Sequence, residues 1–234
     1  MGKALYHSDS ETRRQLLHAA LKSFADLGYA GTSVQHIVDA AHVSKPALYY
    51  YFKDKAGLFD ALVDQAHDER FRLMQEAAAR GNTLAEKLEE IATAIFEFSV
   101  QNRELMRLAF ATAFAASGEA PGQTRCREKG KRAFEFMRSL IEAGQVSGEL
   151  NGRFTVDELA MGIYGQLNSH VMVRLLVPEC PLNRQTARQI VRLFLEGAAG
   201  HSAVANGKLH GTTLSNAKGN GTTKHRQFLL KGKA

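Results

Sequence analysis

Three consecutive tyrosines lie among three lysines in the first quarter of the chain, and these side-chain types suit contact with phosphate groups. Residues 32–52 read TSVQHIVDAAHVSKPALYYYF, with Lys45 ahead of tyrosines 49–51 and with Lys53 and Lys55 after them. A phenol hydroxyl can donate to a phosphate oxygen, and a lysine ammonium group can pair with it. Three successive residues of a helix span about 200° of arc, so at least one or two of the tyrosines must be exposed. The alternative is a structural role, with the tyrosines packed in a core or an interface and the lysines solvated.

Two short helices separated by a tight turn would position these side chains. The sequence predicts one helix over residues 33–40, a turn at 41–43 and a second helix over 44–51. Both would pack on a longer helix predicted over residues 10–28. Apolar residues supply the inward faces of the two short helices: Val34, Ile37, Val38, Ala41, Ala47, Leu48 and Phe52. This arrangement is typical of a helix-turn-helix, whose second helix enters the major groove of DNA with its N-terminal residues toward the base edges.

Capping residues mark the helix starts, and the whole chain is predicted to be helical. Four segments match the S/T-x-x-E/Q capping box: Ser8–Glu11, Thr32–Gln35, Thr83–Glu86 and Thr155–Glu158. Ser44 and Asp54 are expected to cap the helices that follow them. Four glycines are expected to end helices: Gly28, Gly81, Gly118 and Gly144. The sequence predicts an all-α fold of nine helices, over residues 10–28, 33–40, 44–51, 54–80, 84–101, 103–117, 123–143, 155–177 and 184–198.

The net charge of +6 comes entirely from the C-terminal segment. Residues 201–234 hold six basic side chains and no acidic one, whereas residues 1–200 hold 24 of each. The segment lacks apolar periodicity, so a disordered basic tail is predicted there. Such a tail would add only non-specific, salt-sensitive affinity for DNA. Deleting it should weaken general DNA binding slightly and leave any site preference intact.

Composition and motifs argue against several classes of protein. No uncharged apolar run approaches 18 residues, and the polar start lacks the apolar region of a secretory signal, so neither a membrane span nor secretion is expected. Cys126 and Cys180 lack metal-ligand spacing, which favours ordinary thiols in a reducing cytoplasm and no metal site. The sequence holds no GxSxG, Walker, HExxH or di-iron ExxH pattern, so neither enzyme activity nor a cofactor is expected. His67, Asp68 and Glu69 point to different sides of a helix and are not interpreted as a site.

Residues 10–60 resemble the DNA-binding domain of the TetR family of bacterial transcriptional regulators. The stretches LLHAALKSFADLGYAGTSVQHIV and VSKPALYYYFKDKAGLFDAL carry this resemblance. It implies an all-helical homodimer with an N-terminal three-helix domain and a second helical domain that binds an inducer and dimerises. The domains would span residues 10–70, with the motif at about 33–52, and residues 71–200, followed by the tail over 201–234.

The resemblance also implies which residues face DNA. They are Thr32, Ser33, Gln35, Ser44, Lys45, Pro46, Ala47, Tyr49, Tyr50, Tyr51 and Lys55. Pro46 and Ala47 would contact bases and Tyr49 a base or sugar, with Tyr50, Tyr51 and Lys55 near phosphates. One departure concerns the turn, where His42 stands at a position that is usually glycine in the family. Histidine tolerates a left-handed backbone better than β-branched residues do, so the motif is expected to survive.

The second half of the chain carries aromatic and methionine side chains that suit either a core or an apolar ligand cavity. Candidate ligand-binding residues are Phe96, Met106, Phe110, Phe114, Phe134, Met137, Gln166, Asn168 and His170. The helices over residues 155–177 and 184–198 carry small residues and apolar stripes, and the resemblance implies that they pair with their copies in the dimer.

The function expected from the sequence is that of a ligand-responsive repressor in the cytoplasm. It would bind a palindromic operator as a homodimer and be released by a small apolar inducer. Two alternatives remain. One is a helical ligand-binding or scaffold protein with weakened DNA binding, which His42 favours. The other is a regulator controlled by a protein partner.

Overall fold

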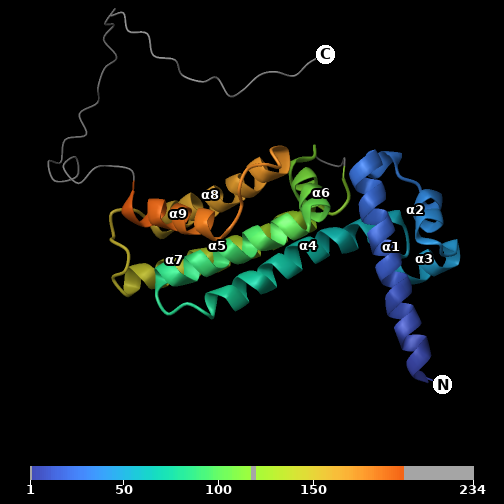
Figure 1. Cartoon of the computed structure of the whole chain (residues 1–234), viewed down its shortest axis with the longest axis horizontal. Helices are drawn as coiled ribbons and strands as arrows, with labels where there is room; N and C mark the ends of the chain where they lie inside the picture. The colour runs from blue at the N-terminus through green and yellow to red at the C-terminus, as the bar shows by residue number, and fades with distance from the viewer. Residues whose placement is uncertain (1, 117–119, 198–234) are drawn as a thin grey trace, which may run out of the picture. The chain divides into compact units, whose positions relative to one another are not determined.

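The chain folds into helices throughout the part that can be described. The computed structural model describes the backbone of residues 2–116 and 120–197, with side chains from Glu11 onward. These residues form nine α-helices and no strand, which confirms the all-α fold class (Figure 1). The bounds are α1 (Gly2–Gly31), α2 (Val34–Ala41), α3 (Lys45–Phe52), α4 (Lys55–Ala78), α5 (Leu84–Gln101), α6 (Arg103–Phe114), α7 (Gln123–Val146), α8 (Val156–Leu176) and α9 (Arg184–Glu196). Gly118 and the predicted tail over 201–234 lie outside the described residues.

Helices α1 to α3 pack together at the N-terminal end of α4 (Figure 1). Their shared core holds Leu16, Ala20, Phe24, Ile37, Val38, Ala41, Leu48, Phe52, Leu58 and Phe59. The inward faces predicted for the two short helices are confirmed, with Val34 and Ala47 only partly buried. Leu27, near the end of α1, is 54% exposed. The ring of Tyr29 packs against Phe24 and Phe59 there, because the backbone changes direction at Gly28.

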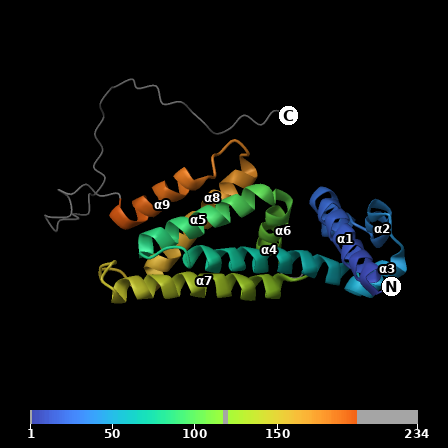
Figure 2. The same cartoon turned by 60° about the horizontal axis from the view of Figure 1, so that its bottom comes forward.

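The remaining helices form a second packed group in which α4 is shared. Helix α4 contacts α5, α6 and α7, while α5 also packs on α9 and α7 on α8 (Figure 2). Fully buried side chains at these contacts include Met74, Leu88, Ile91, Ile95, Phe96, Met137 and Ile141. Two helices of this group, α4 and α6, also contact α1. The second group therefore contacts the N-terminal three-helix unit through two separate helices.

Most of the predicted caps are present. Thr83 with Glu86 and Thr155 with Glu158 form complete reciprocal capping boxes. The box predicted at Ser8–Glu11 is wrong, because α1 already begins at Gly2 and contains no glycine or proline between residues 3 and 27 to interrupt it. Glu11 instead accepts a 2.6 Å hydrogen bond from Arg14 within the helix.

Two of the glycine predictions are also wrong. Gly28 does break its helix, with φ of 71°, a left-handed conformation that favours glycine. Gly144 lies inside α7 rather than after it, and a Cβ atom there would be only 2.5 Å from Leu84 Cδ2. Its role is therefore close helix packing and not helix termination. The prediction for Gly81 is wrong because α4 already ends at Ala78, with Ala79 as its C-cap, and Gly81 does not have a positive φ.

Candidate functional site

The turn between α2 and α3 is formed with histidine in the left-handed conformation. His42 has φ of 55° and ψ of 41°, and its N–H donates to the carbonyl oxygen of Asp39 at 3.2 Å. The next N–H, of Val43, donates to the Val38 carbonyl oxygen at 3.0 Å. The turn therefore has the backbone hydrogen bonds that close α2, although its left-handed residue has a side chain.

Helix α3 presents its N-terminal half and its tyrosines to solvent. Ser44 caps it, since its side chain accepts from the N–H of Ala47, and Pro46 lies in the first turn, where a missing N–H is tolerated. Tyr49 and Tyr50 are 50% and 76% exposed, whereas Leu48 is fully buried. Tyr51 and Ala47 are partly buried. The other predicted DNA-facing residues at the ends of α2 and α3 are exposed: Ser33, Gln35, Ser44, Lys45 and Pro46.

Thr32 contacts the protein itself and is only 1% exposed. Its hydroxyl lies 2.7 Å from the carbonyl oxygen of Gly28 and 3.0 Å from that of Ser23. The prediction that Thr32 caps α2 is wrong, because Ser33 takes this role and accepts from the N–H of His36 at 3.1 Å. Thr32 therefore fixes the position of the link between α1 and α2 by hydrogen bonds to α1.

Lys55 also turns inward, toward the loop that joins α1 to α2. Its ammonium group donates to the carbonyl oxygens of Tyr29 at 2.9 Å and of Thr32 at 2.8 Å. The same nitrogen lies 4.2 Å from the centre of the Tyr29 ring, within range of a cation–π interaction. Asp54 caps α4 as predicted, accepting from the N–H of Gly57. Lys53, by contrast, is exposed at the end of α3.

A cavity of about 340 Å³ lies among four helices of the second group. Helix α4 contributes Arg70 and His67, and α8 contributes Asn168 and Tyr164. The wall formed by α6 is apolar, and α7 adds both polar and small residues. The other lining residues are Ala66, Met106, Ala109, Phe110, Ala113, Ala115, Gln123, Cys126, Arg127 and Gly130. The cavity is thus mainly apolar with polar groups gathered on α4, α7 and α8, as small-molecule sites commonly are.

Three of the nine candidate ligand-binding residues line this cavity: Met106, Phe110 and Asn168. Phe96 and Met137 are fully buried core residues, and Phe114 is 75% exposed. The other three lie outside this lining and are partly buried: Phe134, Gln166 and His170. Phe134 packs on the Tyr164 ring, and the His170 ring lies 6.4 Å from that of Phe96.

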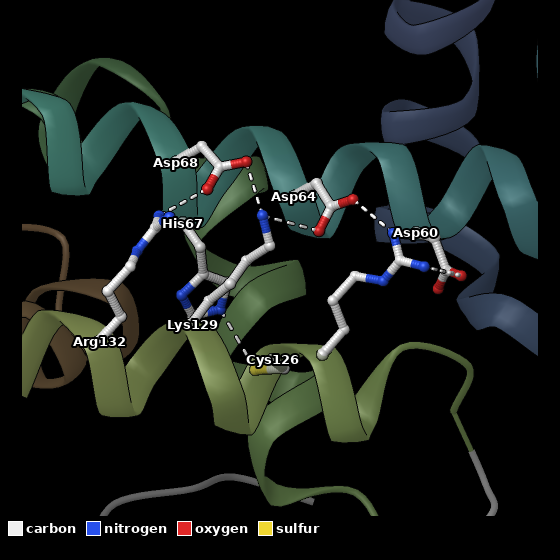
Figure 3. A network of polar contacts seen from close by, with 8 residues as sticks. Asp60, Asp64, His67, Asp68, Cys126, Lys129 and Arg132 are labelled. Atoms are coloured by element: carbon white, nitrogen blue, oxygen red, sulfur yellow. Dashed lines mark hydrogen bonds and ion pairs between the residues drawn. The ribbon is translucent and has the colours of Figure 1, made fainter.

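Sequence reasoning set aside His67, which the structure places on the cavity wall. Its Nε2 atom lies 3.2 Å from the Sγ atom of Cys126 on α7 (Figure 3). Burial is the main reason that the pKa of His67 falls to about 4, and the nearby cations Arg70 and Lys129 lower it further. Burial raises the pKa of the Cys126 thiol. At neutral pH the pair is therefore an uncharged ring beside a protonated thiol.

A row of ion pairs joins α4 to α7 next to this contact. Asp64 and Asp68 both lie within ion-pair distance of Lys129, at 3.1 and 2.6 Å (Figure 3). Arg125 extends the row at Asp64, 2.7 Å away, and Arg132 extends it at Asp68, also at 2.7 Å. Acidic side chains four residues apart share one face of α4, so they meet a basic face of α7. We call these five residues the α4–α7 ion-pair row.

The described residues contain no group of three or more His, Cys, Asp or Glu side chains placed to hold a metal ion. Within the part of the chain that the structure describes, none of the helices is both long and apolar enough to cross a lipid bilayer.

Comparison with known proteins gives a consistent result for the N-terminal unit. Residues 16–62 match the family model described as bacterial regulatory proteins, tetR family. The HTH-type transcriptional regulator AcrR of Shigella flexneri is 27% identical over 205 residues, which cover 84% of this chain and 93% of AcrR. The HTH-type transcriptional activator FasR of Mycolicibacterium smegmatis is 30% identical over 115 residues, or 49% of this chain and 52% of FasR.

The fold extends this similarity beyond the N-terminal unit. The transcriptional regulator FadR of Bacillus subtilis, whose structure was solved in complex with stearoyl-CoA, superposes with a TM-score of 0.67. The match covers 80% of this chain and 99% of FadR, at 20% sequence identity. At that level of identity the likeness shows a shared arrangement of helices.

Proposed function

Because the chain belongs to the tetR family of bacterial regulatory proteins and is a DNA-binding transcriptional regulator, we propose that it acts as a ligand-responsive repressor. It binds a palindromic operator as a homodimer, and a small molecule in the cavity releases it. The single observation that carries the DNA-binding part is the surface of α3, where Tyr49 and Tyr50 are exposed beside a fully buried Leu48.

The DNA-facing surface in this proposal combines the N-terminal ends of α2 and α3 with the tyrosines. Its members are Ser33, Gln35, Ser44, Lys45, Pro46, Ala47, Tyr49, Tyr50, Tyr51 and the exposed Lys53. Small side chains at the start of α3 let the helix approach base edges, and the phenols reach sugars and phosphates. Thr32 and Lys55 support this surface from behind, since both bind carbonyl oxygens of the protein itself.

Dimerisation in this proposal uses the outer faces of α8 and α9. Exposed apolar residues follow helical spacing along α8 at Met161, Met172 and Leu176, with Gly165 and Ser169 between them. Leu193 is 49% exposed on α9. An apolar helical face left in contact with water favours association with a second copy. Two α3 helices would then meet adjacent major grooves, about one turn of DNA apart.

The helices around the cavity also support the proposed release mechanism. Residues of α4 and α6 line the cavity, and both helices contact α1 of the DNA-binding unit. A ligand that fits only one distance between α4 and α6 would fix that distance. Because both helices contact α1, this would change the orientation of the DNA-binding unit. Its affinity must differ between the DNA-competent and the released state, since equal affinity shifts nothing.

Operator selection from random double-stranded DNA tests the proposed function. We expect enrichment of a palindrome bound in a salt-sensitive manner. Tyr49→Ala should lower affinity for this site by about tenfold or more with the melting temperature nearly unchanged. The matched variant Leu48→Ala should instead lower the melting temperature, because it opens a cavity in the core. Absence of any preferred site, or equal loss of stability in both variants, would contradict the proposal.

A further inference from the structure

Arg70 is a buried cation that has no acidic partner among the described residues. Only 8% of the residue is exposed, and it lies on the cavity wall formed by α4. Its Nη2 atom donates to Oδ1 of Asn168 at 2.7 Å, while Nε is buried without a hydrogen-bond partner. The guanidinium carbon lies 5.8 Å from the centre of the Tyr164 ring. Among the described residues no carboxylate lies within ion-pair distance of Arg70.

The side chains nearest to Arg70 do not supply the missing negative charge. Burial and the neighbouring cations keep His67 neutral at pH 7, with a pKa of about 4. Cys126 stays a protonated thiol because burial raises its pKa, so it is no thiolate counter-ion. Asp64 and Asp68 of α4 are paired with basic side chains of α7, and Glu69, the neighbour of Arg70 in sequence, is paired with Arg72. A buried guanidinium without a counter-charge is costly, so the site favours an anion from outside.

Asn168 holds the guanidinium in place for such a partner. Its Nδ2 atom donates to the Tyr164 carbonyl oxygen at 2.8 Å, which directs its Oδ1 atom toward Arg70. The arginine is thereby anchored through one terminal nitrogen, and Nε remains a free donor. A planar guanidinium matches a planar carboxylate by parallel N–H···O bonds.

The rest of the cavity sets the shape of the molecule that carries this carboxylate. The α6 wall consists of Met106, Ala109, Phe110 and Ala113, which offer only apolar surface. The volume of about 340 Å³ is at the small end for ligand sites. One buried cation suits a single negative charge, since the other arginine of the lining, Arg127, is exposed.

We propose that this cavity binds a small monocarboxylate with an aromatic or short aliphatic body, its carboxylate paired with Arg70 and its body against α6. This inference rests on the proposed function, because it takes the cavity to be the site at which the inducer binds. It changes the expected inducer from a purely apolar molecule to an amphipathic anion.

Thermal unfolding and calorimetric titration of the full-length protein test this inference. The probes are benzoate, phenylacetate, 4-phenylbutyrate, octanoate and decanoate, each paired with its primary amide at equal concentration. At about 5 mM, at least one carboxylate should raise the melting temperature and bind saturably, at least about tenfold more tightly than its amide. If no carboxylate binds, or if acid and amide bind equally, the inference is wrong.

Two variants of Arg70 and one control separate binding from folding. Arg70→Met and Arg70→Gln should abolish the preference for the carboxylate over the amide. Without ligand, Arg70→Met should melt at the wild-type temperature or higher, because an unpaired buried charge has been removed. Arg127→Gln, at the exposed rim, should keep the preference. A large fall in melting temperature for Arg70→Met, or an unchanged preference in either Arg70 variant, would overturn the assignment.

The outcomes also distinguish this inference from the proposed function. Operator binding is measured without ligand, and carboxylate binding is measured without DNA. A protein that selects an operator but binds none of the carboxylates would overturn only the ligand assignment. A protein that binds a carboxylate through Arg70 but has no preferred DNA site would overturn only the proposed function.

Discussion

The Nε2 atom of His67 on α4 lies 3.2 Å from the Sγ atom of Cys126 on α7, next to the ion-pair row (Figure 3). Both residues line the cavity. Burial and the charges of Arg70 and Lys129 disfavour a proton on this ring and lower its pKa to about 4. The contact is therefore one between uncharged groups at neutral pH. Protonation would place another cation beside Arg70 in a buried site.

The free energy of unfolding is expected to fall between neutral pH and pH 5 because of His67. The unfolded ring titrates near its ordinary pKa of 6.5 and the folded ring near 4, so the unfolded chain binds more protons between these values. Stability should fall by at most about 2 kcal/mol from about pH 7.5 to about pH 5, since solvent screens a partly exposed ring. Urea unfolding of His67→Gln at the two pH values should show a flatter dependence than the wild type.

The control for this prediction is an exposed histidine. His36→Gln, on the surface of α2, should keep the wild-type dependence on pH. Asp68 does not confuse the comparison: its pKa is lowered from 3.8, so its contribution to stability is lost only as the pH falls below that range. Parallel pH profiles for the wild type and His67→Gln would refute the role given to His67.

Lys129 should contribute more to stability than an ordinary surface lysine. Its side chain is 19% exposed and lies within ion-pair distance of both Asp64 and Asp68. Lys129→Met leaves two acidic side chains without their shared partner and should cost about 1–3 kcal/mol, less in high salt. Arg14→Gln, which removes an exposed pair within α1, should leave the urea midpoint unchanged. Equal effects in the two variants would argue against a special role for the α4–α7 ion-pair row.

Lys53 and Lys55 are two residues apart and should behave differently. Lys55→Met removes two hydrogen bonds to backbone carbonyl oxygens and should destabilise the protein by about 2–3 kcal/mol. Lys53→Met, at an exposed position, should leave the melting temperature unchanged. It should weaken binding to all DNA sequences alike, and it should reduce the slope of log affinity against log salt concentration by about one, as expected for the loss of one phosphate contact. The opposite assignment, with Lys53→Met unstable and Lys55→Met stable but weak in DNA binding, would refute the prediction.

The local signals in the sequence were sufficient for most helix starts and for the core of the N-terminal unit. Capping boxes depend on residues three apart, so Thr83 and Thr155 could be assigned without tertiary information. The pair Thr32–Ser33 offered two candidate caps, and a tertiary contact decides between them. Thr32 is held by carbonyl oxygens of α1, which leaves the cap to Ser33.

The cavity could not be located in the same way, because it depends on how four helices meet. Large aromatic residues such as Phe96 suited a cavity or a core equally, and the structure puts Phe96 in the core. The sequence gives no reason to interpret His67 and Asp68 as a site, because neighbours on a helix point in different directions. Because the two side chains point in different directions, Asp68 pairs with Lys129 in the ion-pair row while His67 lines the cavity. Both contacts are with α7, so they could be recognised only once the position of α7 against α4 was known.

The outer face of α8 should determine the oligomeric state. Met172 is 38% exposed and Leu176 75% exposed, one turn apart on the proposed interface. Met172→Glu introduces a charge that would be desolvated on association, so it should shift the protein toward monomers and raise the dimer dissociation constant at least about tenfold. Light scattering after size-exclusion chromatography measures this shift.

Val146→Glu is the matched control, because this residue is 86% exposed at the end of α7 and outside the proposed interface. A monomer would contact only one half-site, so Met172→Glu should also lose operator affinity, while Val146→Glu should keep both properties. If Met172→Glu remains a dimer, the interface lies elsewhere.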